Sequence, residues 1–152
     1  MASGVAVDDV CGKEFTVLVR STPRKYRAII FKLSDDLSSV CVEKTLPSSN
    51  ITKCTAQEDW KKFVSELPQN DCRFAVYDFE YQTSEGVSKN RIIFVLWSPE
   101  SAKIKSKMLY SSSREALVQK LNGVQKEIQA TDQDEIEFHN VYQQVVASAT
   151  HK

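Results

Sequence analysis

The apolar positions of the chain recur with two periods, one typical of helices and one typical of strands. Spacings of three and four residues predict amphipathic helices, whereas short apolar or alternating runs predict strands. The predicted helices cover residues 8–20, 55–67, 98–121 and 138–147, and the predicted strands cover residues 27–33, 40–44, 72–81, 91–97 and, with a weaker pattern, 128–130. This order predicts an α/β (α+β mixed) fold, in which a mixed sheet is flanked by helices on both faces.

The length of the chain, 152 residues, predicts a single domain that can bury one hydrophobic core. Residues 1–7 are small and apolar and are expected to form a flexible arm. Residues 148–152 are expected to form a frayed tail, because chain ends order only where something holds them.

The longest predicted helix, over residues 98–121, is bounded by start and stop signals. Ser98 can cap the first turn, and Pro99 suits the first helical position. Gly123 can adopt the left-handed conformation that ends many helices.

This helix carries more apolar surface than packing onto a sheet requires. Leu109, Ala116 and Leu117 form a stripe suited to the sheet, whereas Ile104 and Met108 form a separate apolar strip. A basic stripe consists of Lys103, Lys107, Tyr110 and Arg114, and Lys105 flanks the strip. Because a surface helix needs one buried face, the strip indicates either a contact offered to a partner or a more deeply buried helix with solvated lysines. Spacing alone favours the deeper burial.

The charge balance argues against bulk binding to nucleic acid or membranes. Lys and Arg together number 20, as do Asp and Glu, so the formal net charge is zero. No apolar run approaches the roughly 20 residues that span a bilayer. Arg24, Lys25 and Arg27 form a cluster too short for a nuclear signal, and we expect these charges to be solvated.

Cysteine and histidine usage argues against a metal site. The cysteines are Cys11, Cys41, Cys54 and Cys72, and no two have the CxxC spacing of a zinc ligand pair. The chain contains two histidines. We therefore expect reduced thiols in a cytosolic protein, with no metal and no cofactor.

Catalytic patterns are weak. The sequence shows no glycine-rich phosphate loop, and His139 has no serine or cysteine elbow to serve. Asp78 and Glu80 share one face of a predicted strand and could exchange protons with a substrate. A hydrogen-bonded strand edge or a partner contact is the preferred interpretation, so we expect no enzyme. A small hydrolase would need a pocket with convergent polar groups.

Four segments resemble, in order and spacing, the actin-depolymerising factor/cofilin family. They are residues 71–81 (DCRFAVYDFEY), 97–102 (WSPESA), 105–110 (KSKMLY) and 121–124 (LNGV). The opening MASGVAV is also similar to that family, so the resemblance spans residues 2–147. It implies the family fold, a single ADF-homology domain over residues 1–152 with a five-stranded mixed sheet.

The resemblance implies that the long helix enters an apolar cleft of the actin monomer. Ile104 and Met108 would supply the apolar contact, and Lys105 and Lys107 would meet acidic groups of actin. The remaining helical positions that match family contacts are Arg114 and Glu115. On this basis the apolar strip is a partner contact.

The N-terminal arm would lie alongside the same monomer site. Its matching residues are Ser3, Gly4 and Val5. Ser3 matches the serine whose phosphorylation switches the family off, because a charge of about −2 beside a contact built on carboxylates repels the partner.

A second family surface binds the neighbouring subunit of the filament. Its strand part is matched by Lys89 and Arg91. Uncharged residues stand at several positions where the family often carries charge, namely Val118, Gln119, Gln143, Gln144 and Ala147. We therefore expect normal monomer binding with weakened filament binding or severing.

The resemblance implies a monomeric actin-binding protein that promotes filament depolymerisation and turnover. Its expected location is the cytoplasm and cytoskeleton, and a nuclear location is compatible with the resemblance. It also implies a preference for ADP-bound actin and competition from phosphoinositide headgroups for the same lysines. Two alternatives remain: a module that sequesters monomers with little severing, and a regulator of branched nucleation similar to glia maturation factor. The intact residues 105–108 and the N-terminal arm argue against the second alternative.

Overall fold

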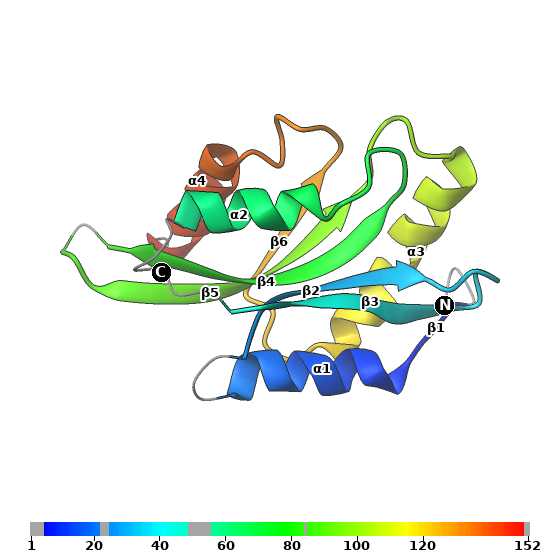
Figure 1. The fold of residues 1–152 in the computed structure, drawn as a ribbon, viewed down its shortest axis with the longest axis horizontal. Coiled ribbons are helices and arrows are strands. Elements are labelled where there is room, and N and C mark those ends of the chain that lie inside the picture. The colour runs from blue at the N-terminus through cyan, green and yellow to red at the C-terminus, as the bar shows by residue number, and fades with distance from the viewer. Residues whose placement is uncertain (1–4, 22–24, 49–55, 84, 151–152) are drawn as a thin grey trace.

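A mixed sheet of six strands forms the centre of the molecule (Figure 1). The computed structural model describes residues 5–21, 25–48, 56–83 and 85–150, with backbone alone from residue 147. The strands are β1 (Ala6–Val7), β2 (Tyr26–Leu33), β3 (Ser39–Pro47), β4 (Arg73–Gln82), β5 (Ser88–Trp97) and β6 (Lys126–Ala130). The helices are α1 (Asp9–Arg20), α2 (Ala56–Ser65), α3 (Ile104–Lys120) and α4 (Phe138–Thr150).

The strand order is β1-β3-β2-β4-β5-β6, in which β1 and β6 pair in parallel and the inner strands pair antiparallel. The five strands predicted from the sequence correspond to β2 to β6. The additional strand, β1, has two residues and pairs with the start of β3.

Helices cover both faces of the sheet, as the pattern predicts. In Figure 1, α1 and α3 lie on one side of the sheet and α2 and α4 on the other. The alternation in β4 follows this division. Phe74 and Val76 join the core under α1 and α3, whereas Ala75, Tyr77 and Phe79 join the core under α2 and α4. The period of two residues in a strand therefore determines which core each side chain enters.

The N-terminal arm differs from the expected flexible segment. Val5 is 3% exposed and belongs to the hydrophobic core. Ala6 and Val7 pair with Ser39 and Val40 of β3. The expectation of flexibility is therefore wrong for residues 5–7, because their apolar side chains and backbone groups find partners at the sheet edge. Residues 1–4 lie outside the described part of the chain.

The long helix begins later than the sequence predicts. The N–H of Ser98 donates to the carbonyl of Ala130 (2.9 Å), which extends the pairing of β5 with β6, and the N–H of Ala102 donates back to Pro99 (3.0 Å) in a turn. Lys103 occupies the N-cap position of α3. Pro99 thus lies in the turn that precedes the helix. The helix ends at Lys120 with Leu121 as its C-cap, one residue before the predicted end, and Gly123 follows with a φ of 127°.

Among the described residues, no helix is both long enough and apolar enough to cross a membrane. The same ranges contain no cluster of three or more potential metal-ligating side chains. Cys11, Cys41 and Cys72 are free thiols, and burial raises the pKa of Cys11 to about 12. Cys54 lies outside the described residues.

Candidate protein-interaction surface

Two large apolar side chains project from the first turns of α3 into solvent. Ile104 is 74% exposed and Met108 is 66% exposed, the highest values among the large hydrophobic side chains described. They are four residues apart, so they lie one above the other on a single face of the helix. We call this pair the apolar ridge. Its exposure contradicts the interpretation of a deeply buried helix.

Lysines border the apolar ridge. Lys103 and Lys105 are exposed, and Lys107 is half-buried. Within the described ranges, none of these three lysines takes part in an ion pair with a carboxylate. Their charges therefore remain available to an acidic partner, and the arrangement combines an apolar contact with basic neighbours.

The opposite face of α3 packs onto the sheet through Tyr110, Ser113 and Leu117, all of which are buried. The sequence pattern places Tyr110 on one stripe with the basic residues Lys103, Lys107 and Arg114, but in the structure its side chain is buried. Its ring lies 5.0 Å from that of Phe74, and its hydroxyl accepts a hydrogen bond of 3.0 Å from the N–H of Leu33. Burial raises the pKa of Tyr110 to about 12. A phenol satisfies both demands, since it is largely apolar and has one polar end.

A side-chain network attaches the start of α3 to β4. Ser106 Oγ donates to Asp71 Oδ1 over 2.9 Å, and Asp71 also accepts hydrogen bonds from the Cys72 N–H and from Arg73. Arg73 forms a further ion pair of 2.8 Å with Glu43 of β3. Partial burial opposes ionisation of Asp71, but these donors lower its pKa below the ordinary value. The network fixes the direction in which the apolar ridge points.

Arg114 and Glu115, the other two helical positions predicted to contact the partner, have different surroundings. Glu115 is exposed. The Arg114 guanidinium forms an ion pair with Glu127 of β6, and its side chain is 39% exposed. Arg114 therefore attaches the second half of α3 to the sheet edge and still presents part of its surface to solvent.

The strand that follows the N-terminal part of the predicted site, β1, lies next to α3. The Ala6 N–H donates to the Ser38 carbonyl (3.0 Å), and β1 contacts α3. Ser3 and Gly4 fall outside the described residues. Because Val5 is buried, its side chain contributes to the core and does not offer a contact to a partner.

The predicted second surface lies at the other end of the molecule. Lys89 is exposed near the start of β5, and Arg91 donates to the Gln125 carbonyl over 3.0 Å. Figure 1 shows the β4–β5 hairpin and the end of α4 at the end of the molecule opposite to the start of α3. Gln143 and Gln144 of α4 are exposed, and the Ala147 side chain lies outside the described residues.

Asp78 and Glu80 both lie beside a buried arginine, Arg27, with the Asp78 carboxylate 4.0 Å from Nη1. Arg27 is 4% exposed, its Nη1 lies 2.6 Å from Glu80, and its Nε lies 2.9 Å from Asp59 of α2. It also donates to the Asp78 carbonyl over 2.9 Å. The expectation that Arg27 is solvated is therefore wrong. The geometry favours a structural ion pair over acid–base chemistry for this pair of carboxylates.

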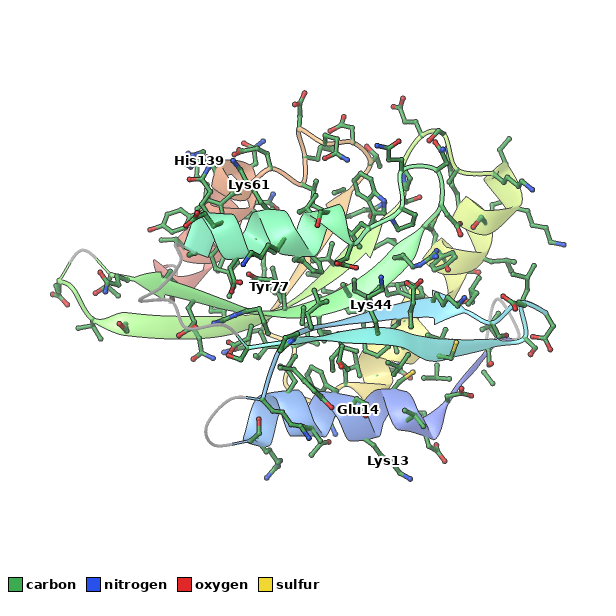
Figure 2. The ribbon with its side chains drawn as sticks, viewed as in Figure 1. Lys13, Glu14, Lys44, Lys61, Tyr77 and His139 are labelled. Atoms are coloured by element: carbon green, nitrogen blue, oxygen red, sulfur yellow. The ribbon has the colours of Figure 1, made fainter. Side chains whose placement is uncertain are left out.

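The hollows on the surface offer little catalytic chemistry. One of about 730 Å³ is lined by Leu67, Trp97 and Asp132 among others, and its lining contains no histidine or cysteine. Figure 2 shows His139 on the outer side of α4 and Tyr77 inside, beneath α2.

Comparisons with known proteins agree with this geometry. The family model described as "Cofilin/tropomyosin-type actin-binding protein" matches residues 4–146. The chain is 44% identical over 139 residues to actin-depolymerizing factor 3 of Zea mays, covering 91% of this chain and 93% of that protein. It is 40% identical over 144 residues to cofilin of Ogataea parapolymorpha, covering 94% and 93%. The structure of actin depolymerization factor 2 from Plasmodium berghei is similar with a TM-score of 0.82 and 31% identity, covering 99% and 100%.

Proposed function

The chain belongs to the family of cofilin/tropomyosin-type actin-binding proteins, and on that premise we propose that it binds actin and promotes the depolymerisation of actin filaments. The observation that carries the proposal is the exposure of Ile104 and Met108 at 74% and 66%. When a partner buries exposed apolar side chains, the removal of their surface from water makes the free energy of association more favourable. The alternative monomer-sequestering function is considered below.

The apolar ridge supplies binding energy, and the lysines supply orientation. Burying a side chain such as Ile104 or Met108 contributes about 1.5–3 kcal/mol. Lys105 and Lys107 then meet acidic groups of an apolar cleft on actin, where removing one partner of a desolvated charge pair costs about 2–5 kcal/mol of binding free energy. Glu115 and the exposed part of Arg114 extend the contact along α3.

Ser3 and Gly4 are proposed to approach the same monomer site through β1, which contacts α3. Phosphorylation of Ser3 adds about −2 charge. That charge would repel the carboxylates of actin and could also attract the lysines beside the apolar ridge. Both effects weaken binding, so Ser3 is the proposed regulatory position.

Lys89 and Arg91 are proposed to contact a neighbouring actin subunit in a filament. Among the α4 side chains that the structure describes, Gln143 and Gln144 are exposed near this end, and both are uncharged. The second contact therefore has fewer charges than the family often carries there. This favours weaker binding to filaments or weaker severing of them. If this contact is too weak to act, the protein sequesters monomers.

The proposed mechanism requires no chemical step. Binding energy shifts the equilibrium of a polymer and the geometry of its subunits, so the protein acts as a binding partner and not as an enzyme. We further propose that it acts as a monomer on ADP-bound actin in the cytoplasm and cytoskeleton, with phosphoinositide headgroups competing for the lysines beside the apolar ridge.

Filament co-sedimentation together with monomer binding tests the proposal. We expect the protein to bind actin monomers and to increase the actin left in the supernatant. Lys105→Ala with Lys107→Ala should lose monomer binding and remain folded, since exposed lysines rarely hold a core. Unchanged monomer affinity in that double variant would contradict the assigned site. Robust pelleting at about one protein per actin subunit would contradict the weakened filament contact.

A further inference from the structure

Leu37 lies in the β2–β3 turn with a backbone conformation that non-glycine residues rarely adopt. Its φ is 62°, and it is the one described non-glycine residue with a positive φ. A leucine is strained in this left-handed region, whereas glycine and asparagine accept it readily. The side chain is 38% exposed and belongs to neither hydrophobic core, so core packing does not account for the strain.

The turn around Leu37 is held in one conformation by its neighbours. The Leu37 N–H donates to the Ser34 carbonyl (2.8 Å). The Asp36 carboxylate accepts hydrogen bonds from the hydroxyls of Ser34 (2.6 Å) and Ser38 (2.7 Å) and from the Ser38 N–H (3.1 Å). These bonds stabilise the ionised carboxylate and lower the pKa of Asp36 to about 2. The exposed leucine is therefore presented by a rigid support.

This support is attached to both halves of the proposed monomer site. The Ser38 carbonyl, next to Leu37, accepts the Ala6 N–H of the N-terminal strand. The Leu33 N–H, where β2 ends and the turn begins, donates to Tyr110 on α3. In Figure 1 the β2–β3 turn and the start of α3 lie at the same end of the molecule.

We infer that Leu37 is a second apolar contact for the same actin monomer that receives Ile104 and Met108. Strained residues persist where a function requires them, and an exposed leucine in a turn that would accept glycine or asparagine without strain fits that description. The partner would need an apolar spot beside the cleft filled by the apolar ridge. Beside Leu37, Asp35 is fully exposed and lies 3.9 Å from Lys32 Nζ, at the limit of an ion pair. This inference rests on the proposed function.

Replacing Leu37 separates binding from stability. Leu37→Gly and Leu37→Asn both remove the apolar side chain and both accept a positive φ. We expect each to unfold at the same temperature as the wild type or a higher one, because strain is relieved. We expect each to bind purified actin monomers about fivefold more weakly, because one partly buried leucine contact is lost.

Val87→Ser is the matched control, since Val87 is 50% exposed in the β4–β5 hairpin at the opposite end of the molecule. Its monomer affinity should equal that of the wild type. Wild-type affinity in both Leu37 variants would overturn the inference while leaving the proposed function intact. A lower unfolding temperature together with lost binding would place Leu37 in the core and would also overturn it. If the wild-type protein itself fails to bind monomers, the proposed function fails first.

Discussion

Ser106 Oγ donates a hydrogen bond of 2.9 Å to Asp71 Oδ1, and this bond joins the first turns of α3 to the start of β4. Ser106 stands between Lys105 and Lys107, so the residue that anchors the helix is adjacent in sequence to the residues that face the partner. Asp71 is itself held by Arg73 and by the Cys72 N–H. The direction of the apolar ridge therefore depends on a polar network that is partly buried.

Removal of this hydroxyl tests the anchoring role. Ser106→Ala should lower the free energy of unfolding by about 0.5–1.5 kcal/mol, the usual net value of one hydrogen bond, although alanine is a better helix former. We expect monomer affinity to fall a few-fold because α3 is less firmly oriented. Chemical denaturation and monomer binding measure the two effects. Ser65→Ala is the control, since its hydroxyl bonds within α2 to the Lys62 carbonyl; equal behaviour of the two variants would refute the anchor.

Tyr110→Phe should destabilise the fold more strongly. The change leaves the buried Leu33 N–H without its acceptor, which costs about 1–3 kcal/mol. Urea denaturation measures the loss. Tyr142→Phe on α4 is the matched control, because Tyr142 is half-buried and packs mainly through its ring against Phe79 and Phe138. A Tyr110→Phe variant as stable as the wild type would show that the hydroxyl contributes nothing.

The fold was predictable where the periodicity of the sequence is strong. The segments 72–81 and 91–97 predict long strands, and β4 and β5 form there with the expected division of side chains between two cores. Ile104 and Met108 also stand out in the sequence as surplus apolar surface, but spacing alone favoured their burial, and only the family resemblance indicated the exposure that the structure has.

Other features depend on contacts between distant segments, which no local pattern records. The helix α3 begins at Ile104 and not at the predicted Ser98, because Ser98 continues the pairing of β5 with β6. The burial of Tyr110 was not predicted because the group that its hydroxyl accepts from, the Leu33 N–H, lies on β2, far away in the sequence. Arg27 could not be placed from its sequence neighbours, since its partners Asp59 and Glu80 come from α2 and β4.

Acid should weaken the β2–β3 turn through Asp36. Hydrogen bonds from Ser34 and Ser38 lower the pKa of Asp36 from an ordinary value near 4 to about 2 in the folded state. A carboxylate with a lowered folded pKa stabilises the fold above its unfolded pKa, and this stabilisation is lost as the pH falls from about 4 to about 2. NMR titration of the carboxyl carbon should give the low pKa. Asp36→Asn should remove this part of the pH dependence of stability; an ordinary pKa near 4 would contradict the hydrogen-bonded turn.

New cations on α4 should strengthen the filament contact. Gln143→Lys with Gln144→Arg places charges beside the end that carries Lys89 and Arg91, so we expect severalfold tighter co-sedimentation with filaments and unchanged monomer affinity. The control is Asn122→Lys with Gln133→Arg, which adds the same charge at exposed positions outside α4 and the β4–β5 hairpin. Equal gains in both double variants would indicate a non-specific charge effect.

The most direct test of the proposed actin contact is the monomer affinity of a variant without the apolar ridge. Ile104→Gln with Met108→Gln keeps good helix formers at exposed positions, so the unfolding temperature should match that of the wild type. Loss of two buried apolar contacts should weaken binding to monomeric actin by about a hundredfold or more. A folded double variant that binds actin monomers as tightly as the wild type would contradict the central claim that α3 presents these two side chains to actin.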